Sequence, residues 1–291
     1  LATSKDFMTG FLTNSFFAAD SFFFLSGFLL SFVWINHLKK NPRQMFSIRA
    51  WLLFYLHRFL RLSPAFYSAA FFSAFIVDRH WLRDMPLLMD VLPSFLSSTS
   101  SWWPSPLYVS NFVHWNSLCF SPGVYLAAEM QMFFFSPLLL APLASKPRAG
   151  VFLAVLLVVM STAAHVFTVF HFHWPASALD LGPHDPEARN MEEYGLWLHT
   201  APYIRCQTYV MGILAGWFMR SRKTIAIHWI INLVCWLLSF CLMLTVVLGL
   251  YSHNNGLYVS VFWRAAYSSL SRPAWGLALA WIIISCYYGY G

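Results

Sequence analysis

The chain has 291 residues, of which 59% are hydrophobic and only 10% are charged, whereas soluble domains carry about a quarter charged residues. This balance excludes an ordinary soluble globular domain and favours a protein embedded in a membrane. The net charge of +7 comes from short basic blocks between apolar runs. Because these blocks form no continuous stripe, no nucleic-acid partner is expected.

Apolar runs of about twenty residues are long enough to cross a bilayer as helices, and the sequence contains seven such runs. We expect spans at about 16–35, 59–77, 124–144, 149–170, 201–219, 228–250 and 272–290. Pro64 and Pro137 lie inside two of them, where membrane helices tolerate proline as a kink. The predicted fold class is therefore an all-α, polytopic transmembrane helix bundle of about seven spans.

The connections between these spans alternate in charge. The basic residues concentrate in the first, third and fifth connections, as Lys39, Lys40, Arg43, Arg49, Arg58, Arg61, Lys146, Arg148, Arg220, Arg222 and Lys223. The positive-inside rule then puts Leu1 on the outer side and Gly291 at the cytosolic end. We expect 1–291 to form one membrane domain, with the long 78–123 connection as an ordered cap over the outer face.

Ionisable side chains inside the spans are the candidates for a functional site, because a charge in hydrocarbon is costly without a partner or a wet cavity. Asp20, Glu129 and Arg205 lie at the fifth or sixth residue of inward-running spans, roughly 6–9 Å below the outer boundary. His165 lies in the same layer, and Arg272 opens the last span on that side. These groups predict a polar cavity; salt bridges between packed helices are the alternative.

Arg58 and Arg61 stand three residues apart at the start of the second predicted span, on one side of a helix. Their forked donors suit the phosphates of a nucleotide-like ligand or of a lipid head, and a positive-inside anchor is the alternative. His171 and His173 lack accompanying Cys or carboxylate spacing, so no metal site is predicted.

The segment 16–30 reads FFAADSFFFLSGFLL and resembles the D-x-F-F-x-L-S-G pattern in the second span of the acyltransferase 3 superfamily. The resemblance continues through the stretches 57–64, 102–103, 107–112 and 125–137. These later stretches, together with 205–212 and 272–275, are similar to the animal branch, the nose-resistant-to-fluoxetine proteins. The resemblance therefore covers nearly the whole chain.

This resemblance implies a larger membrane domain, incomplete here at both ends, whose first span with its Arg and His would precede Leu1. It implies transfer of an acyl group from acyl-CoA, as co-substrate and without a further cofactor, to a hydroxyl of a lipid, sugar or small amphiphile. The expected catalytic residues are Asp20, Glu129, Arg205 and His165, and the expected substrate-binding residues are Arg58 and Arg61.

A carrier of lipids and hydrophobic small molecules is the alternative function, because a buried polar cavity between helices serves transport equally well. A seven-helix receptor would match the number of spans, but the triplet 78–80 and the pair of outer acids argue against it. The expected partners are membrane lipids, acyl-CoA and a small amphiphilic acceptor. The expected location is integral to the plasma membrane or the endoplasmic reticulum.

Overall fold

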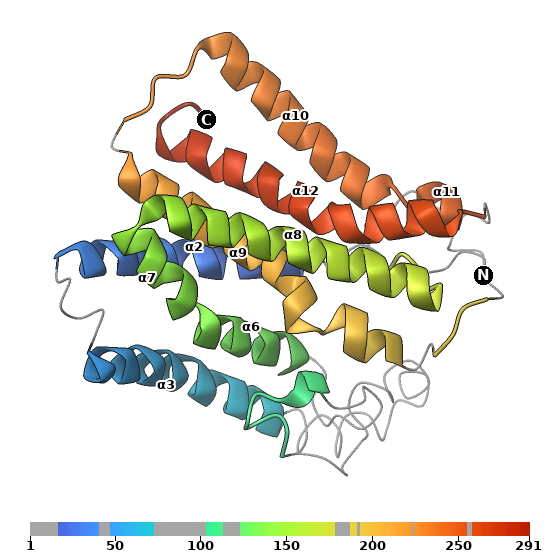
Figure 1. The fold of residues 1–291 in the computed structure, drawn as a ribbon, viewed down its shortest axis with the longest axis horizontal. Helices are drawn as coiled ribbons and strands as arrows, with labels where there is room; N and C mark the ends of the chain where they lie inside the picture. The colour runs from blue at the N-terminus through green and yellow to red at the C-terminus, as the bar shows by residue number, and fades with distance from the viewer. Residues whose placement is uncertain are drawn as a thin grey trace. The chain divides into compact units, whose positions relative to one another are not determined.

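The computed structural model describes the stretches 17–40, 47–72, 103–112, 123–177, 187–190, 193–222, 224–254 and 258–291. Over these stretches the chain folds into helices and turns and contains no strand (Figure 1). Helices satisfy their backbone hydrogen bonds internally, as a chain surrounded by lipid requires. The predicted all-α fold class is therefore confirmed.

Five helical stretches in the described part of the chain are long and apolar enough to cross a membrane. They belong to α2 (Phe17–Lys40), α6 with α7 (Gly123–Phe135 and Pro137–Ser145), α8 (Pro147–Phe172), α10 (Trp229–Leu248) and α12 (Val261–Tyr287). Each corresponds to one of the predicted spans. Their length and composition fit an integral membrane protein.

The other two predicted spans correspond to α3 (Ile48–Phe72) and α9 (Pro202–Ser221). Both are long enough to cross a bilayer, but neither meets the apolar criterion that the other five meet. α3 carries Arg49, Arg58 and Arg61, whereas most of α9 is buried. A buried helix faces other helices instead of lipid, so its polar side chains can find partners.

The start predicted for the last span is wrong, because α12 begins at Val261 and not near 272. The residues before Pro273 include Arg264, Ser268 and Ser269, which interrupt the apolar run but are buried. Pro273 lies inside the helix and, having no N–H, leaves the carbonyl of Ser269 without its intrahelical donor. Arg272 is consequently well inside α12, roughly 16 Å along the axis from its first residue at 1.5 Å per residue.

The start predicted for the second span is wrong as well, because α3 begins at Ile48 and not near 59. Arg58 and Arg61 therefore lie in the interior of a helix. Charged residues lower the hydropathy of a window without ending a helix, because arginine is itself a good helix former, and α3 continues through both Arg58 and Arg61. Pro64 lies inside α3, as expected.

The chain divides into two compact units. The first unit comprises Leu1–Lys40, Pro137–Tyr194 and Tyr203–Gly291, and the second comprises Asn41–Ser136 and Gly195–Pro202. The break between α6 and α7 coincides with this division. Most of the predicted 78–123 cap, with the triplet 78–80, lies outside the described residues, and only 103–112 and Gly123 of it are described.

In the first unit, α2 and α9 cross with their backbones in contact. A Cβ atom on Gly27 would collide with the carbonyl oxygen of Tyr209, and one on Gly212 with the carbonyl oxygen of Phe24. Small residues allow membrane helices to approach this closely. The candidate residues of these two helices lie about two turns before their glycines, so the crossing also brings those side chains near each other.

In the second unit, α3 and α6 pack through aromatic rings, with Phe54 and Phe133 stacked at 4.3 Å between centroids. The short helix Ser110–Phe112 is attached to α6 by paired amides, because Gln131 and Asn111 exchange hydrogen bonds of 2.8 and 2.9 Å. This unit also contains the π-helical turn Gly195–His199.

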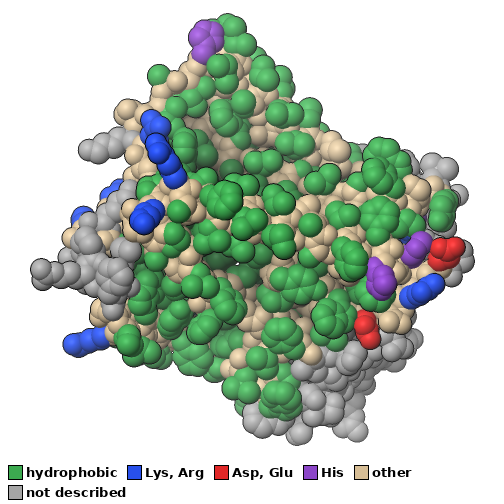
Figure 2. Space-filling view, in the orientation of Figure 1, with side chains coloured by type: hydrophobic (Ala, Val, Ile, Leu, Met, Phe, Trp, Pro, Cys, Tyr) green, Lys and Arg blue, Asp and Glu red, His purple; other side chains and the backbone are tan. Residues whose placement is uncertain are grey.

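The exposed surfaces of α8 and α10 are apolar, as a surface that faces lipid requires. Figure 2 shows hydrophobic side chains covering much of the visible face. The most exposed hydrophobic side chains of these two helices include Phe152, Met160, Phe167, Trp229 and Leu237.

Candidate functional site

A buried carboxylate is the centre of a polar cluster in the first unit. Asp20 of α2 and Arg205 of α9 form an ion pair of 3.0 Å between Oδ1 and Nη1, and each side chain is 1% exposed. An ion pair removed from water in this way is costly to form, and deleting one partner costs about 3–5 kcal/mol. The arrangement therefore needs both partners in place.

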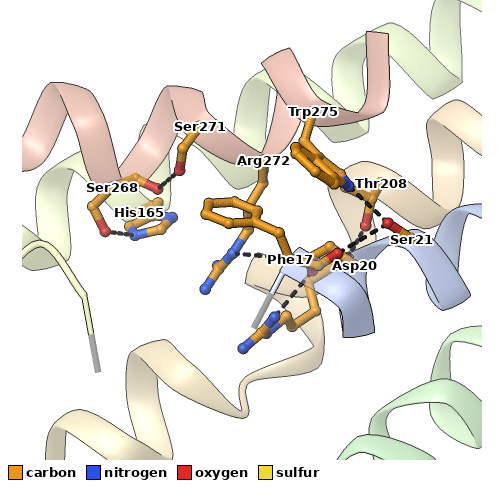
Figure 3. A network of polar contacts seen from close by, with 10 residues as sticks. Phe17, Asp20, Ser21, His165, Thr208, Ser268, Ser271, Arg272 and Trp275 are labelled. Atoms are coloured by element: carbon orange, nitrogen blue, oxygen red, sulfur yellow. Dashed lines mark hydrogen bonds and ion pairs between the residues drawn. The ribbon is translucent and has the colours of Figure 1, made fainter. Parts of the chain in front are cut away.

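Arg272 of α12 joins the same carboxylate from the other side, with its Nε 3.7 Å from Oδ2 of Asp20. One turn further along α12, Trp275 donates from Nε1 to the hydroxyl of Ser21 at 2.8 Å (Figure 3). The ring of Trp275 also lies 5.4 Å from that of Phe17. Each carboxylate oxygen thus faces one guanidinium group, and the contacts connect α2, α9 and α12.

His165 of α8 is completely buried beside this cluster. Its Nε2 lies 2.8 Å from the hydroxyl oxygen of Ser268 on α12, and its Nδ1 has no hydrogen-bond partner among the described residues. The guanidinium groups of Arg272 and Arg205 lie within electrostatic range of the imidazole. A carboxylate, two guanidinium groups and an imidazole therefore gather in the first unit.

The second unit holds a separate ion pair between Glu129 of α6 and Arg58 of α3. These side chains are 19% and 18% exposed, and the guanidinium of Arg58 lies 4.5 Å above the ring of Phe133. Arg61 is exposed, and in the described part of the chain it makes no ion pair. Arg58 is thus a cation already matched by a carboxylate, whereas the side chain of Arg61 is exposed.

Gln131, two residues after Glu129 on α6, holds the segment 103–112 against this helix through hydrogen bonds. Tyr108 accepts from Gln131 at its carbonyl (3.0 Å), and its hydroxyl lies 2.9 Å from that of Ser63. Burial raises the pKa of the Tyr108 hydroxyl above its ordinary value, so this group remains a neutral hydrogen-bonding group. Tyr108 also has a positive φ of 56°, which is uncommon for a non-glycine residue.

The predicted site residues therefore fall into two sets, Asp20, Arg205 and His165 in the first unit and Glu129, Arg58 and Arg61 in the second. Their roles remain predictions. Sequence reasoning missed Ser268, because the last span was expected to begin after it. The run of serines just before Arg272 in an otherwise apolar segment was the available signal. No group of three or more potential metal ligands occurs among the described residues.

The profile of the acyltransferase 3 family, described as an acyltransferase domain, matches residues 2–291. The chain belongs to this family, which confirms the resemblance seen in its motifs.

Two curated relatives come from Caenorhabditis elegans. The chain is 26% identical over 303 residues to Nose resistant to fluoxetine protein 6, an alignment that covers 99% of this chain and 36% of that protein. It is 25% identical over 226 residues to Regulator of hypoxia-inducible factor 1, covering 74% of this chain and 42% of that protein. The chain thus spans less than half the length of either relative. No solved structure matches.

Proposed function

We propose that this chain is the membrane part of an O-acyltransferase, which moves an acyl group from acyl-CoA to a hydroxyl of a lipid, a sugar or a small amphiphile. The observation that supports this most is the buried Asp20–Arg205–Arg272 cluster beside His165. Such a cluster is costly to bury, so it indicates a function beyond packing. Membership of the acyltransferase 3 family points to the same chemistry.

In this proposal His165 is the general base. The acceptor oxygen attacks the thioester carbonyl carbon while the hydroxyl proton passes to His165. The carbon–sulfur bond then breaks, and the thiol leaves with the proton returned by the imidazole. Arg205 and Arg272 stabilise the oxyanion that develops on the carbonyl oxygen, and Asp20 holds both guanidinium groups in position.

Arg58 and Arg61 are the proposed binding residues for the donor phosphates, since guanidinium groups match phosphate geometry. Arg61 is exposed, and Glu129 orients Arg58. The proposed setting is the plasma membrane or the endoplasmic reticulum, with membrane lipids, acyl-CoA and an amphiphilic acceptor as partners.

The test is acyl transfer by the purified full-length protein, given radiolabelled acyl-CoA and a panel of hydroxyl acceptors. We expect labelled ester to form, and the variant His165→Gln to lose on the order of 10²-fold or more in kcat, the usual contribution of a general base. The exposed residue Glu187 supplies the control Glu187→Gln, which should retain full turnover. Ligand uptake into vesicles without any ester would contradict the proposal and favour a carrier.

A further inference from the structure

Exposed basic side chains collect at one end of the first unit. The end of α2, the start of α8 and the end of α9 lie on the same side of this unit (Figure 1), and Figure 2 shows Lys and Arg side chains there. We call these residues the basic rim, and all of them are exposed: Lys40, Lys146, Arg148, Arg220 and Arg222. Within the described part of the chain, none of the five forms an ion pair.

The sequence around the basic rim contains no carboxylate. No Asp or Glu occurs in the stretches 21–77, 130–179 and 194–291, which together contain all the rim residues. The other end of the unit differs, because the exposed Glu187 lies 3.5 Å from His173, directly after the end of α8. A surface with an excess of one charge attracts the opposite charge, so the basic rim suits an anionic partner.

Arg220 of the rim is held in place by neutral groups. Its guanidinium donates to the side-chain oxygen of Asn36 on α2 and lies 5.8 Å from the centre of the Phe32 ring. Lys40 follows Asn36 by about one helical turn, so it lies on the same side of α2. The charge of Arg220 is therefore oriented without being neutralised, since Asn36 is not ionised.

The connection that carries Arg222 is fixed as well. The hydroxyl of Tyr288, directly after α12, donates to the carbonyl of Arg222 at 2.7 Å. The hydroxyl of Tyr290 donates to the carbonyl of Ile225 at 2.9 Å and accepts from the N–H of Ile227 at 3.2 Å. A surface whose groups are already ordered loses less entropy when a ligand binds, so the rim has the properties of a binding surface.

We propose that the basic rim binds the headgroup of an anionic phospholipid, whose phosphate matches the guanidinium groups. Apolar surface adjoins the rim, because α10 follows Arg222 and begins with Trp229, and α8 continues from Arg148 to Phe152. Both aromatic side chains are 69% exposed, as lipid-facing side chains are. A lipid whose chains pack against them has its headgroup at the level of the rim.

The expected topology agrees with this partner. The positive-inside rule puts the basic connections on the cytosolic side, and the cytosolic leaflet carries the anionic lipids that attract basic segments. The inference concerns a surface that the proposed acyl transfer does not use, and it stands independently of that function.

The first experiment measures lipid binding by the purified full-length protein in detergent, with native mass spectrometry as the readout. The probes are phosphatidylserine, phosphatidylcholine and inorganic phosphate. We expect the wild type to prefer phosphatidylserine. The triple variant Lys40→Gln, Arg220→Gln and Arg222→Gln should bind it on the order of 10²-fold more weakly, at roughly 5-fold for each charge removed.

Arg189→Gln is the matched control, because Arg189 is an exposed arginine at the end of the unit that carries Glu187. It should bind phosphatidylserine like the wild type. An equal loss in this control, an unchanged affinity in the triple variant, or equal binding of both lipids by the wild type would overturn the inference. Displacement of phosphatidylserine by inorganic phosphate would do so too, because it indicates a site for the free ion.

The second experiment separates an ordered surface from charge alone. Asn36→Ala retains every basic residue of the rim but removes the group that orients Arg220. We expect phosphatidylserine to bind roughly 3-fold more weakly, as the loss of one hydrogen bond implies. Thermal unfolding without added lipid verifies that each variant is folded. Wild-type affinity in a folded Asn36→Ala protein would contradict the claim that the rim is an ordered site.

Discussion

The two ion pairs of this protein bury similar groups to different degrees. Asp20 is 1% exposed and faces guanidinium groups from two other helices, whereas Glu129 is 19% exposed and pairs with Arg58. Desolvation is therefore nearly complete in the first unit and partial in the second. The cluster of the first unit is therefore the more costly of the two to bury. We expect substitutions at the two pairs to change stability and activity by different amounts.

The largest effect should follow from leaving Asp20 without its main partner. We expect Arg205→Leu to lower the free energy of unfolding by about 3–5 kcal/mol, because the carboxylate stays buried without that guanidinium. Denaturant unfolding in detergent micelles measures the change. The exposed Arg222 supplies the control Arg222→Leu, and equal losses in both variants would contradict the burial argument.

The next largest effect concerns the helix crossing that supports the first cluster. Gly212→Ala places a methyl group against the carbonyl oxygen of Phe24, so we expect a loss of about 1–3 kcal/mol from overpacking. Thermal unfolding checks this value. Gly195 has open space around its Cβ position, and Gly195→Ala should lack any such steric loss. A stable Gly212→Ala protein would show that close contact of α2 and α9 is unnecessary.

At the second pair, stability and activity should separate. Glu129→Ala should cost only about 1 kcal/mol, as expected of a partly solvated ion pair, and the full-length protein should still insert into membranes. Turnover should nevertheless be abolished, because Arg58 loses the carboxylate that orients it. Protease protection in microsomes measures insertion, and unchanged turnover would rule out a role for Glu129.

The smallest effect concerns Tyr108, whose hydroxyl lies within hydrogen-bonding distance of Ser63. Tyr108→Phe should cost only about 0.5 kcal/mol below pH 9, the low end of the net contribution of a hydrogen bond. Burial raises the pKa of this hydroxyl above its unfolded value of about 10, so its stabilisation is complete below that pH and is lost as the pH rises through the folded pKa. The wild type should therefore lose more stability than the variant in alkaline solution, and parallel unfolding curves would contradict this.

The sequence was sufficient for the fold class and for the positions of most helices, because long apolar runs carry that information directly. The sequence did not reveal where α3 and α12 begin. A hydropathy window treats Arg58 and the polar residues before Pro273 as ends, but arginine is a good helix former, and the polar residues before Pro273 lie buried within α12. The existence of a helix is therefore easier to predict than its boundary.

The site was predictable in part for a similar reason. Counting residues from the span ends placed Asp20 and Arg205 in one layer, and the structure has them 3.0 Å apart. The same count could not reveal that Glu129 takes Arg58 as its partner. Partner choice depends on how helices face one another, and one sequence contains no direct signal for it. The contact of Ser268 with His165 was hidden for the same reason.

Replacing Asp20 and Arg205 by neutral residues tests most directly whether the buried cluster takes part in acyl transfer. Asp20→Asn combined with Arg205→Gln leaves the sum of charges of Asp20, Arg205 and Arg272 unchanged, so the fold should survive better than in either single variant. We predict that this double variant in the full-length protein unfolds within about 2 kcal/mol of the wild type, less than the loss from breaking a buried pair, yet transfers no labelled acyl group. Wild-type rates of acyl transfer from the double variant would contradict the assignment of this cluster to catalysis.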